Sequence, residues 1–170
     1  RFKMRLFVPE VPSERIVEDK KYRLISHRGN VDGKYPQYEN SPEYVDRALD
    51  MGYDCEVDLW IDNDGIYLGH DEPTYPIDLK YLTDRNLHLW IHCKDLKTVS
   101  KLRELQLNLL IDLNYFFHST DDCTITSRGH IWVYPGKQPI KNSIAVMPEW
   151  HNDDIKEAYG ICSDYIKKYK

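Results

Sequence analysis

Short apolar runs separated by polar segments recur along most of this chain, as expected for buried strands that meet polar loops. Several runs hold Val, Ile, Leu, Tyr or Trp and end abruptly at a charged residue or a histidine. The pattern predicts about eight strands, within residues 22–26, 54–61, 66–71, 87–94, 107–117, 130–136, 143–150 and 159–166. The polar turn 62–65 (DNDG) indicates a hairpin-like connection without a helix.

Helical periodicity lies between several of these runs. Ser41 and Pro42 suit the N-cap and first turn of a helix that Gly52 would end. Residues 95–106 (DLKTVSKLRELQ) space leucine and valine at three-residue steps, which predicts an amphipathic helix. A short helix is also expected over 152–160.

Strands that alternate with helices favour an α/β fold. We expect a reduced TIM-like (β/α)8 barrel with several helices missing, because such barrels usually need about 250 residues and this chain has 170. An open α/β sheet is the alternative on pattern alone. We expect residues 1–21, with two prolines and mixed charges, to form an N-terminal arm, and residues 22–170 to form a single domain.

Composition narrows the classes of function. The net charge of −5 argues against a nucleic-acid partner, and no apolar run reaches the roughly 20 residues that span a bilayer, so we expect no stable membrane insertion. The first residues lack the apolar stretch of a signal peptide. The four cysteines match no zinc-site spacing and three lie in apolar runs, which fits reduced core cysteines and a cytoplasmic setting.

Polar residues with catalytic potential gather where the predicted strands end. In a parallel barrel those carboxyl ends meet on one face, where active sites form. The residues are His27 and Arg28 after the first strand, Glu56 and Asp58 on the second, His70 after the third, and His92 and Lys94 on the fourth.

Glu56 and Asp58 are two residues apart, so on a strand both side chains point to the same face. Two inward carboxylates repel each other and lose hydration, a cost that a divalent cation would offset. Their oxygen ligands suit Mg²⁺ or Ca²⁺. A solvated acidic pair on an edge strand is the alternative.

His27 and His70 flank this pair and suit a general acid and a general base, because phosphodiester cleavage needs one proton removed and another supplied. Arg28 and Lys94 would bind the phosphoryl oxygens. Either histidine alone could instead be a satisfied core residue.

The order of these motifs resembles that of the glycerophosphodiester phosphodiesterase family, whose barrel is shared with phosphatidylinositol-specific phospholipases C and spider-toxin phospholipases D. The matching fragments are HRG at 27–29, Glu39-Asn40, E-x-D at 56–58, His70-Asp71 and Lys94. The resemblance covers about residues 22–96, and the ending GICSDYI is similar to the last strand of these barrels. It implies His27 and His70 as the acid/base pair, Glu56 and Asp58 as metal ligands, and Glu39 as a second-shell or metal-proximal residue.

One position departs from that family pattern. An acidic metal ligand usually precedes the lysine by two residues, and here His92 stands there, on the same face as Lys94. We expect His92 to be the third ligand. The cofactor is then a divalent ion, with Mg²⁺ the first choice and Mn²⁺ or Ca²⁺ as alternatives, although imidazole favours Mn²⁺ or Zn²⁺ over Ca²⁺.

The resulting expectation is a metal-dependent phosphodiesterase that hydrolyses small glycerophosphodiester-like substrates. Its rivals are a phospholipase D-type lyase that forms a cyclic phosphate, and a degenerate module that binds phosphorylated ligands or a partner without turnover. Little apolar surface near the site is visible in the sequence, which disfavours a lipid substrate. Trp150 could line the pocket, since aromatic walls suit cations, or be an ordinary rim residue. Missing helices could leave apolar strands that a second copy covers, giving an oligomer.

Overall fold

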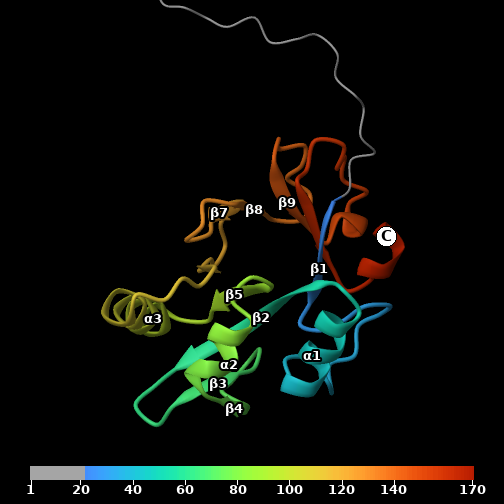
Figure 1. Ribbon diagram of the computed structural model, residues 1–170. Helices are drawn as coiled ribbons and strands as arrows, with labels where there is room; N and C mark the ends of the chain where they lie inside the picture. Colours follow the sequence, from blue (N-terminus) through green and yellow to red (C-terminus); the bar gives the residue numbers. More distant parts are fainter. Residues whose placement is uncertain (1–21) are drawn as a thin grey trace, which may run out of the picture.

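The computed structural model describes residues 22–170, which build one mixed sheet of ten strands (Figure 1). The predicted N-terminal arm, residues 1–21, lies outside this range. The strands are β1 Arg23–His27, β2 Asp54–Ile61, β3 Ile66–Leu68, β4 Tyr75–Ile77, β5 Leu89–Cys93, β6 Tyr115–Phe116, β7 Cys123–Ile125, β8 Ile131–Val133, β9 Ser143–Val146 and β10 Gly160–Ser163. The helices are α1 Pro42–Asp50, α2 Leu79–Asp84 and α3 Leu96–Leu109, with 3₁₀ turns η1 Pro148–Trp150 and η2 Ile166–Tyr169.

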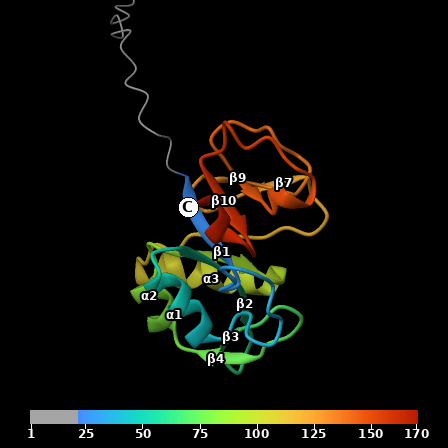
Figure 2. The same cartoon turned by 90° about the vertical axis from the view of Figure 1, so that its right-hand side faces the viewer.

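Seven of the strands run parallel, in the spatial order β6-β5-β2-β1-β10-β9-β8. Strands β3, β4 and β7 are antiparallel additions, paired with β2, β3 and β8 respectively. The sheet curls, so that β7–β10 stand above the helices in Figure 2 while β2–β4 lie among them. All seven parallel strands therefore present their carboxyl ends toward one end of the curl.

The expected reduced (β/α)8 barrel is wrong: the sheet is mixed, open and only half-barrel-like, with few helices between its strands. A helix follows β1 and β5, but β2 continues into the antiparallel β3. The connection from β8 to β9, residues 134–142, contains Pro135, Gly136 and Pro139. Proline and glycine disfavour a helix there. Nine residues are also too few for the usual crossover helix of roughly ten residues plus its loops.

Local sequence explains the helices that do form. Pro42 occupies the first turn of α1, as predicted, although the side chain of Ser41 makes no capping hydrogen bond. Asp95 caps α3 by accepting a hydrogen bond from the backbone N–H of Thr98 at 2.6 Å. α3 extends to Leu109, past the predicted boundary at residue 106. Its C-cap residue, Leu110, has the left-handed conformation.

Two apolar clusters pack on opposite faces of the curled sheet. On the outer face, Cys55, Val57 and Leu59 pack with Ile91 and the fully buried Leu102 of α3. Inside the curl a second cluster combines residues from six strands: Ile25, Trp90, Phe116, Trp132, Ile144 and Cys162. The Phe116 and Trp132 rings lie 4.5 Å apart between β6 and β8, so aromatic packing spans the gap where no strand pairing is found within residues 22–170.

Several local predictions differ from the structure. Most of the expected strand 107–117 continues α3 or is coil, and only Tyr115–Phe116 is strand. The expected helix over 152–160 is absent, while β4, α2 and β7 were not predicted. No helix in the described range is both long and apolar enough to cross a membrane.

Candidate metal and phosphate site

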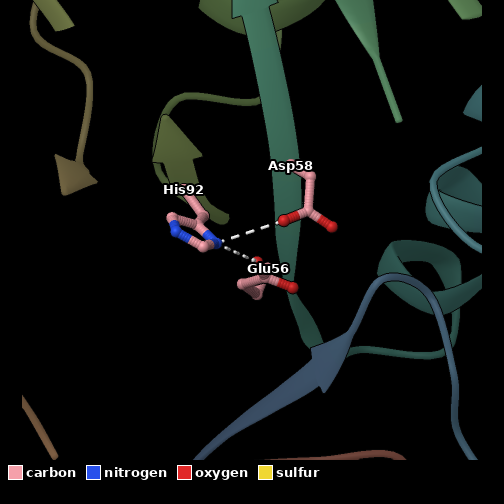
Figure 3. Close-up of side chains that lie close together, drawn as sticks. All are labelled: Glu56, Asp58 and His92. Carbon is pink, nitrogen blue, oxygen red and sulfur yellow. Dashed lines mark ion pairs between the residues drawn. The ribbon is translucent and has the colours of Figure 1, made fainter. Parts of the chain in front are cut away.

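The carboxylates of Glu56 and Asp58 face the inside of the curl, as the alternation along β2 predicts (Figure 3). Glu56 is 2% exposed and Asp58 is fully buried. Cys55, Val57 and Leu59 occupy the opposite face under the helices. The alternative of a solvated acidic pair on an edge strand is therefore wrong, since β2 lies between β1 and β5.

His92 brings a nitrogen to the two carboxylates. It is paired with Asp58 in the β2–β5 register, and its Nδ1 lies 3.1 Å from Asp58 Oδ1 and 3.8 Å from Glu56 Oε1 (Figure 3). One ligand atom from each of the three residues lies within 4.8 Å of the others. These are the three residues predicted as metal ligands.

Two cationic side chains also reach Asp58. Arg28 Nε lies 2.9 Å from Asp58 Oδ2 and Lys94 Nζ lies 3.1 Å from Asp58 Oδ1, while the Asn40 amide donates to Oδ2 at 2.9 Å. Burial opposes charge on Asp58, but the hydrogen bond with His92 and the attraction of Arg28 and Lys94 outweigh it and lower the Asp58 pKa. Asp58 is therefore ionised at neutral pH.

Glu56 differs from its neighbour in its electrostatic surroundings. Burial and the charge of Asp58 raise the pKa of Glu56, more strongly than His27, Arg28 and His92 lower it. Its Oε2 is buried and accepts no hydrogen bond. A buried carboxylate oxygen without a partner is costly, and a bound cation would supply the missing partner.

A charge count at the site also favours a cation. The buried carboxylates are Glu39, Glu56, Asp58 and Asp164, and the cationic side chains among them are Arg28 and Lys94. The four carboxyl groups outnumber the two cationic side chains, and a divalent ion would offset that excess. Carboxylate oxygens with one imidazole form a donor set that such an ion accepts, so the residues fit the predicted metal.

Glu39 acts on the site through Arg28. Its Oε2 accepts a hydrogen bond from Arg28 Nη1 at 3.1 Å, and its Oε1 accepts one from the Asn30 amide at 3.0 Å. Burial works against the Arg28 charge, but Asp58, Glu56 and Glu39 raise its pKa above the ordinary value. Glu39 thus orients the guanidinium and is not among the three residues with ligand atoms close together.

His27 lies between two carboxylates. Its Nδ1 is 2.7 Å from Asp164 Oδ1, and its Nε2 is 3.7 Å from Glu56 Oε2. Asp164, just after β10, also accepts from the Asn30 amide at 2.8 Å. Burial would raise the pKa of Asp164, but the hydrogen bonds from His27 and Asn30 lower it overall. Asp164 therefore fixes the His27 ring with one nitrogen directed into the site.

His70 stands at the mouth of the site. Its side chain is 42% exposed and its Nδ1 lies 2.7 Å from Asp71 Oδ1. Partial burial, followed by the charges of Arg28 and Lys94, lowers the pKa of His70. His70 is consequently neutral at pH 7 and can accept a proton.

Several of these residues line a cavity of about 310 Å³. Its polar lining is formed by His27, Arg28, Glu56, His70, His92, Lys94, His118 and Ser119. The rest of the lining is apolar and aromatic: Phe116, Trp132, Tyr134, Pro135, Val146, Met147 and Trp150. Trp150 does line the cavity and is 63% exposed at its rim. The expectation of little apolar surface near the site is wrong, because β6 pairs with β5 beside His92 and the curl brings β8 and β9 to the same cavity.

Three contributors were not assigned roles from the sequence. Asp164 lies 137 positions from its partner His27, and no local pattern joins them. His118 stacks on His92 with ring centroids 4.4 Å apart, whereas its sequence context indicates only a loop. Asn30 follows the HRG fragment directly, and only that proximity could have indicated it.

No family model, curated protein or solved structure matches this chain.

Proposed function

We propose that this protein is a divalent-metal-dependent phosphodiesterase that acts on small glycerophosphodiester-like substrates. One observation carries the proposal: a buried carboxylate pair and an imidazole lie at metal-ligand spacing, and two further histidines and two cations gather around the cavity beside them. The order of motifs that resembles glycerophosphodiester phosphodiesterases adds independent support. The two lines meet in the same residues.

Glu56, Asp58 and His92 would hold the metal ion. When bound, the ion supplies positive charge that polarises a phosphoryl oxygen or lowers the pKa of a bound hydroxyl. Arg28 and Lys94 border the same cavity and would bind the remaining phosphoryl oxygens, whose charge is redistributed in the transition state.

The two histidines divide the proton transfers. His70 is neutral at pH 7 and takes the proton from the attacking hydroxyl, which belongs to water or to an adjacent substrate alcohol. His27 lies between the carboxylates of Asp164 and Glu56, and it gives its proton to the departing alkoxide. One proton is removed and one is supplied, so the enzyme returns to its starting state after proton exchange with water.

Turnover of a small panel tests the proposal. Glycerophosphoethanolamine, glycerophosphocholine, an aryl phosphodiester and lysophosphatidylcholine are each incubated with Mg²⁺, Mn²⁺, Ca²⁺ or chelator, beside His27→Ala. We expect metal-dependent cleavage of the small diesters that is lost in the variant. No turnover with any ion by folded protein would replace the proposal with a binding module, and an accumulating cyclic phosphate would replace hydrolysis with the lyase reaction.

A further inference from the structure

A second cavity, of about 410 Å³, adjoins the cavity already described, and the two share Arg28 and His70. We name the first the aromatic cavity, for its wall of Phe116, Trp132, Tyr134, Met147 and Trp150. We name the second the polar cavity, lined by Lys34, Glu39, Asp71, Glu72 and Thr74 beside the shared pair. Arg28, proposed to bind the phosphate, and His70, proposed to take the proton, thus lie at the junction of the two cavities.

The aromatic cavity has a built apolar wall. Trp132 is 3% exposed, and its ring lies 4.5 Å from Phe116 and 5.8 Å from Trp90. Trp150 lies at the rim with no side-chain hydrogen bond among the described residues. Both indoles line the cavity, so both can contact an apolar group bound there.

The polar cavity offers hydrogen-bonding groups of both kinds. Lys34 donates, the Asp71 and Glu72 carboxylates accept, and the Thr74 hydroxyl donates to the backbone carbonyl of Glu72 at 3.0 Å while its lone pairs remain available. An alcohol that carries further hydroxyls can use both kinds of partner, whereas a hydrocarbon can use none.

We propose that the substrate is an asymmetric phosphodiester, with its polyol arm in the polar cavity and an apolar arm in the aromatic cavity. This inference rests on the proposed function, since it places the phosphate at Arg28 and His70. About 310 Å³ is at the lower limit of ordinary ligand pockets. The apolar arm is therefore a single ring or a chain of a few carbons rather than a full acyl chain.

The test compares three diesters whose leaving alcohols are all alkanols: glycerol benzyl phosphodiester, glycerophosphoethanolamine and the symmetric diglycerol phosphodiester. We expect kcat/KM for the benzyl diester to exceed the other two by about fivefold to tenfold, the range expected for one aromatic contact pair. Trp150→Ala removes that preference and Trp150→Phe restores most of it. Lys34→Met lowers kcat/KM for all three glycerol diesters alike.

Tyr159→Ala is the matched control, because Tyr159 is also an exposed aromatic but lines a cavity at the opposite end of the strands. It leaves the ratio of the substrates unchanged. Equal kcat/KM for the benzyl and ethanolamine diesters, or a preference that survives Trp150→Ala, overturns the two-arm proposal while leaving the phosphodiesterase intact.

Binding separates the two failures if no diester turns over. Titration calorimetry with benzylphosphonate and 2-hydroxyethylphosphonate measures affinity without chemistry. Tighter binding of benzylphosphonate, reduced in Trp150→Ala, supports the aromatic cavity even in an inactive protein. Equal affinities, or equal losses in Trp150→Ala and Tyr159→Ala, overturn it.

Discussion

The part of the sheet from β1 to α3, blue to yellow in Figure 1, and the part from β6 to β10, orange to red, are built differently. The first carries all three α-helices of the described chain on its outer face and buried charges on its inner face. The second has only 3₁₀ turns and loops, and its inner face is apolar, with Phe116, Trp132, Ile144 and Cys162. Helix-covered strands hold charges in fixed positions, and the loop-connected strands supply an apolar wall to the same cavity.

This contrast assigns separate tasks to the two parts. Removing a group from β1, β2 or β5 should change the chemistry, whereas removing a side chain from β8 or η1 should change which substrate is preferred. Variants in each part test that division.

The largest effect is expected for His27. We expect His27→Gln to lower kcat by about 10²- to 10⁴-fold, the usual contribution of a positioned general acid. The control is His88→Gln, because His88 also contacts a buried carboxylate, Asp54, but at the opposite end of the strands. Steady-state kinetics should show near-normal kcat for the control; a similar loss in both variants would mean that the His27 effect is structural.

The helix-covered packing is tested by Leu102→Ala. Leu102 is fully buried between α3 and the outer face of β2 and β5, so its truncation should cost about 2–5 kcal/mol of unfolding free energy. Leu110→Ala, at a site 92% exposed, should change it by less than about 0.5 kcal/mol. Urea unfolding followed by circular dichroism measures both; equal values would show that the outer helix does not stabilise this part.

Glu56→Gln should leave the metal-free protein as stable as wild type or stabilise it, whereas most substitutions of buried residues destabilise. Because the pKa of Glu56 is raised in the folded protein, the folded state binds more protons than the unfolded state between the two pKa values. Metal-free stability therefore falls as pH rises through that window. Without metal, Glu56→Gln should equal or exceed wild type at pH 7.5, and the difference should shrink toward pH 4.

The same pair of proteins also tests metal binding. Mn²⁺ should raise the melting temperature of wild type and leave that of Glu56→Gln nearly unchanged, because a bound ion stabilises only the state that holds it. Thermal melts with chelator and with added Mn²⁺ give both values. An equal rise in both proteins would place the ion elsewhere.

The smallest effect is expected for His118, which joins the aromatic wall to His92. Burial, then the charges of His92 and Lys94, lowers the pKa of His118 to about 4. Between the unfolded value near 6.5 and about 4, the unfolded state binds the extra proton, so metal-free stability falls as pH falls. His118→Phe keeps a stacked ring without a titrating group and should weaken the pH dependence of urea unfolding over that window; an unchanged slope would contradict this.

The first part was the more predictable one from sequence. Alternation placed Glu56 and Asp58 on one face of β2 and His92 on the same face of its neighbour, and the structure pairs them. The Pro42 start of α1 was predicted because its signal is local. The hairpin-like turn after β2 was also predicted from a local signal. That the sheet is mixed and open was not inferred from this turn.

The second part was poorly predicted because its interactions are distant in sequence. Trp132 and Phe116 lie on strands that do not pair with each other, and only the curl brings their rings together in the lining of the cavity. Asp164 reaches His27 across the parallel pairing of β1 with β10, which joins the two ends of the described chain. Strands of two to four residues, such as β6 and β7, give too few positions for a periodic pattern.

The most direct test of the central claim is a phosphorus NMR time course of glycerol benzyl phosphodiester with metal-free protein, before and after addition of Mg²⁺ or Mn²⁺. We expect the diester signal to stay constant in chelator. Once the ion is added, a phosphomonoester signal should grow with wild type but not with His27→Gln. An unchanged diester signal with every ion, from protein whose circular dichroism spectrum is that of the folded state, would contradict it.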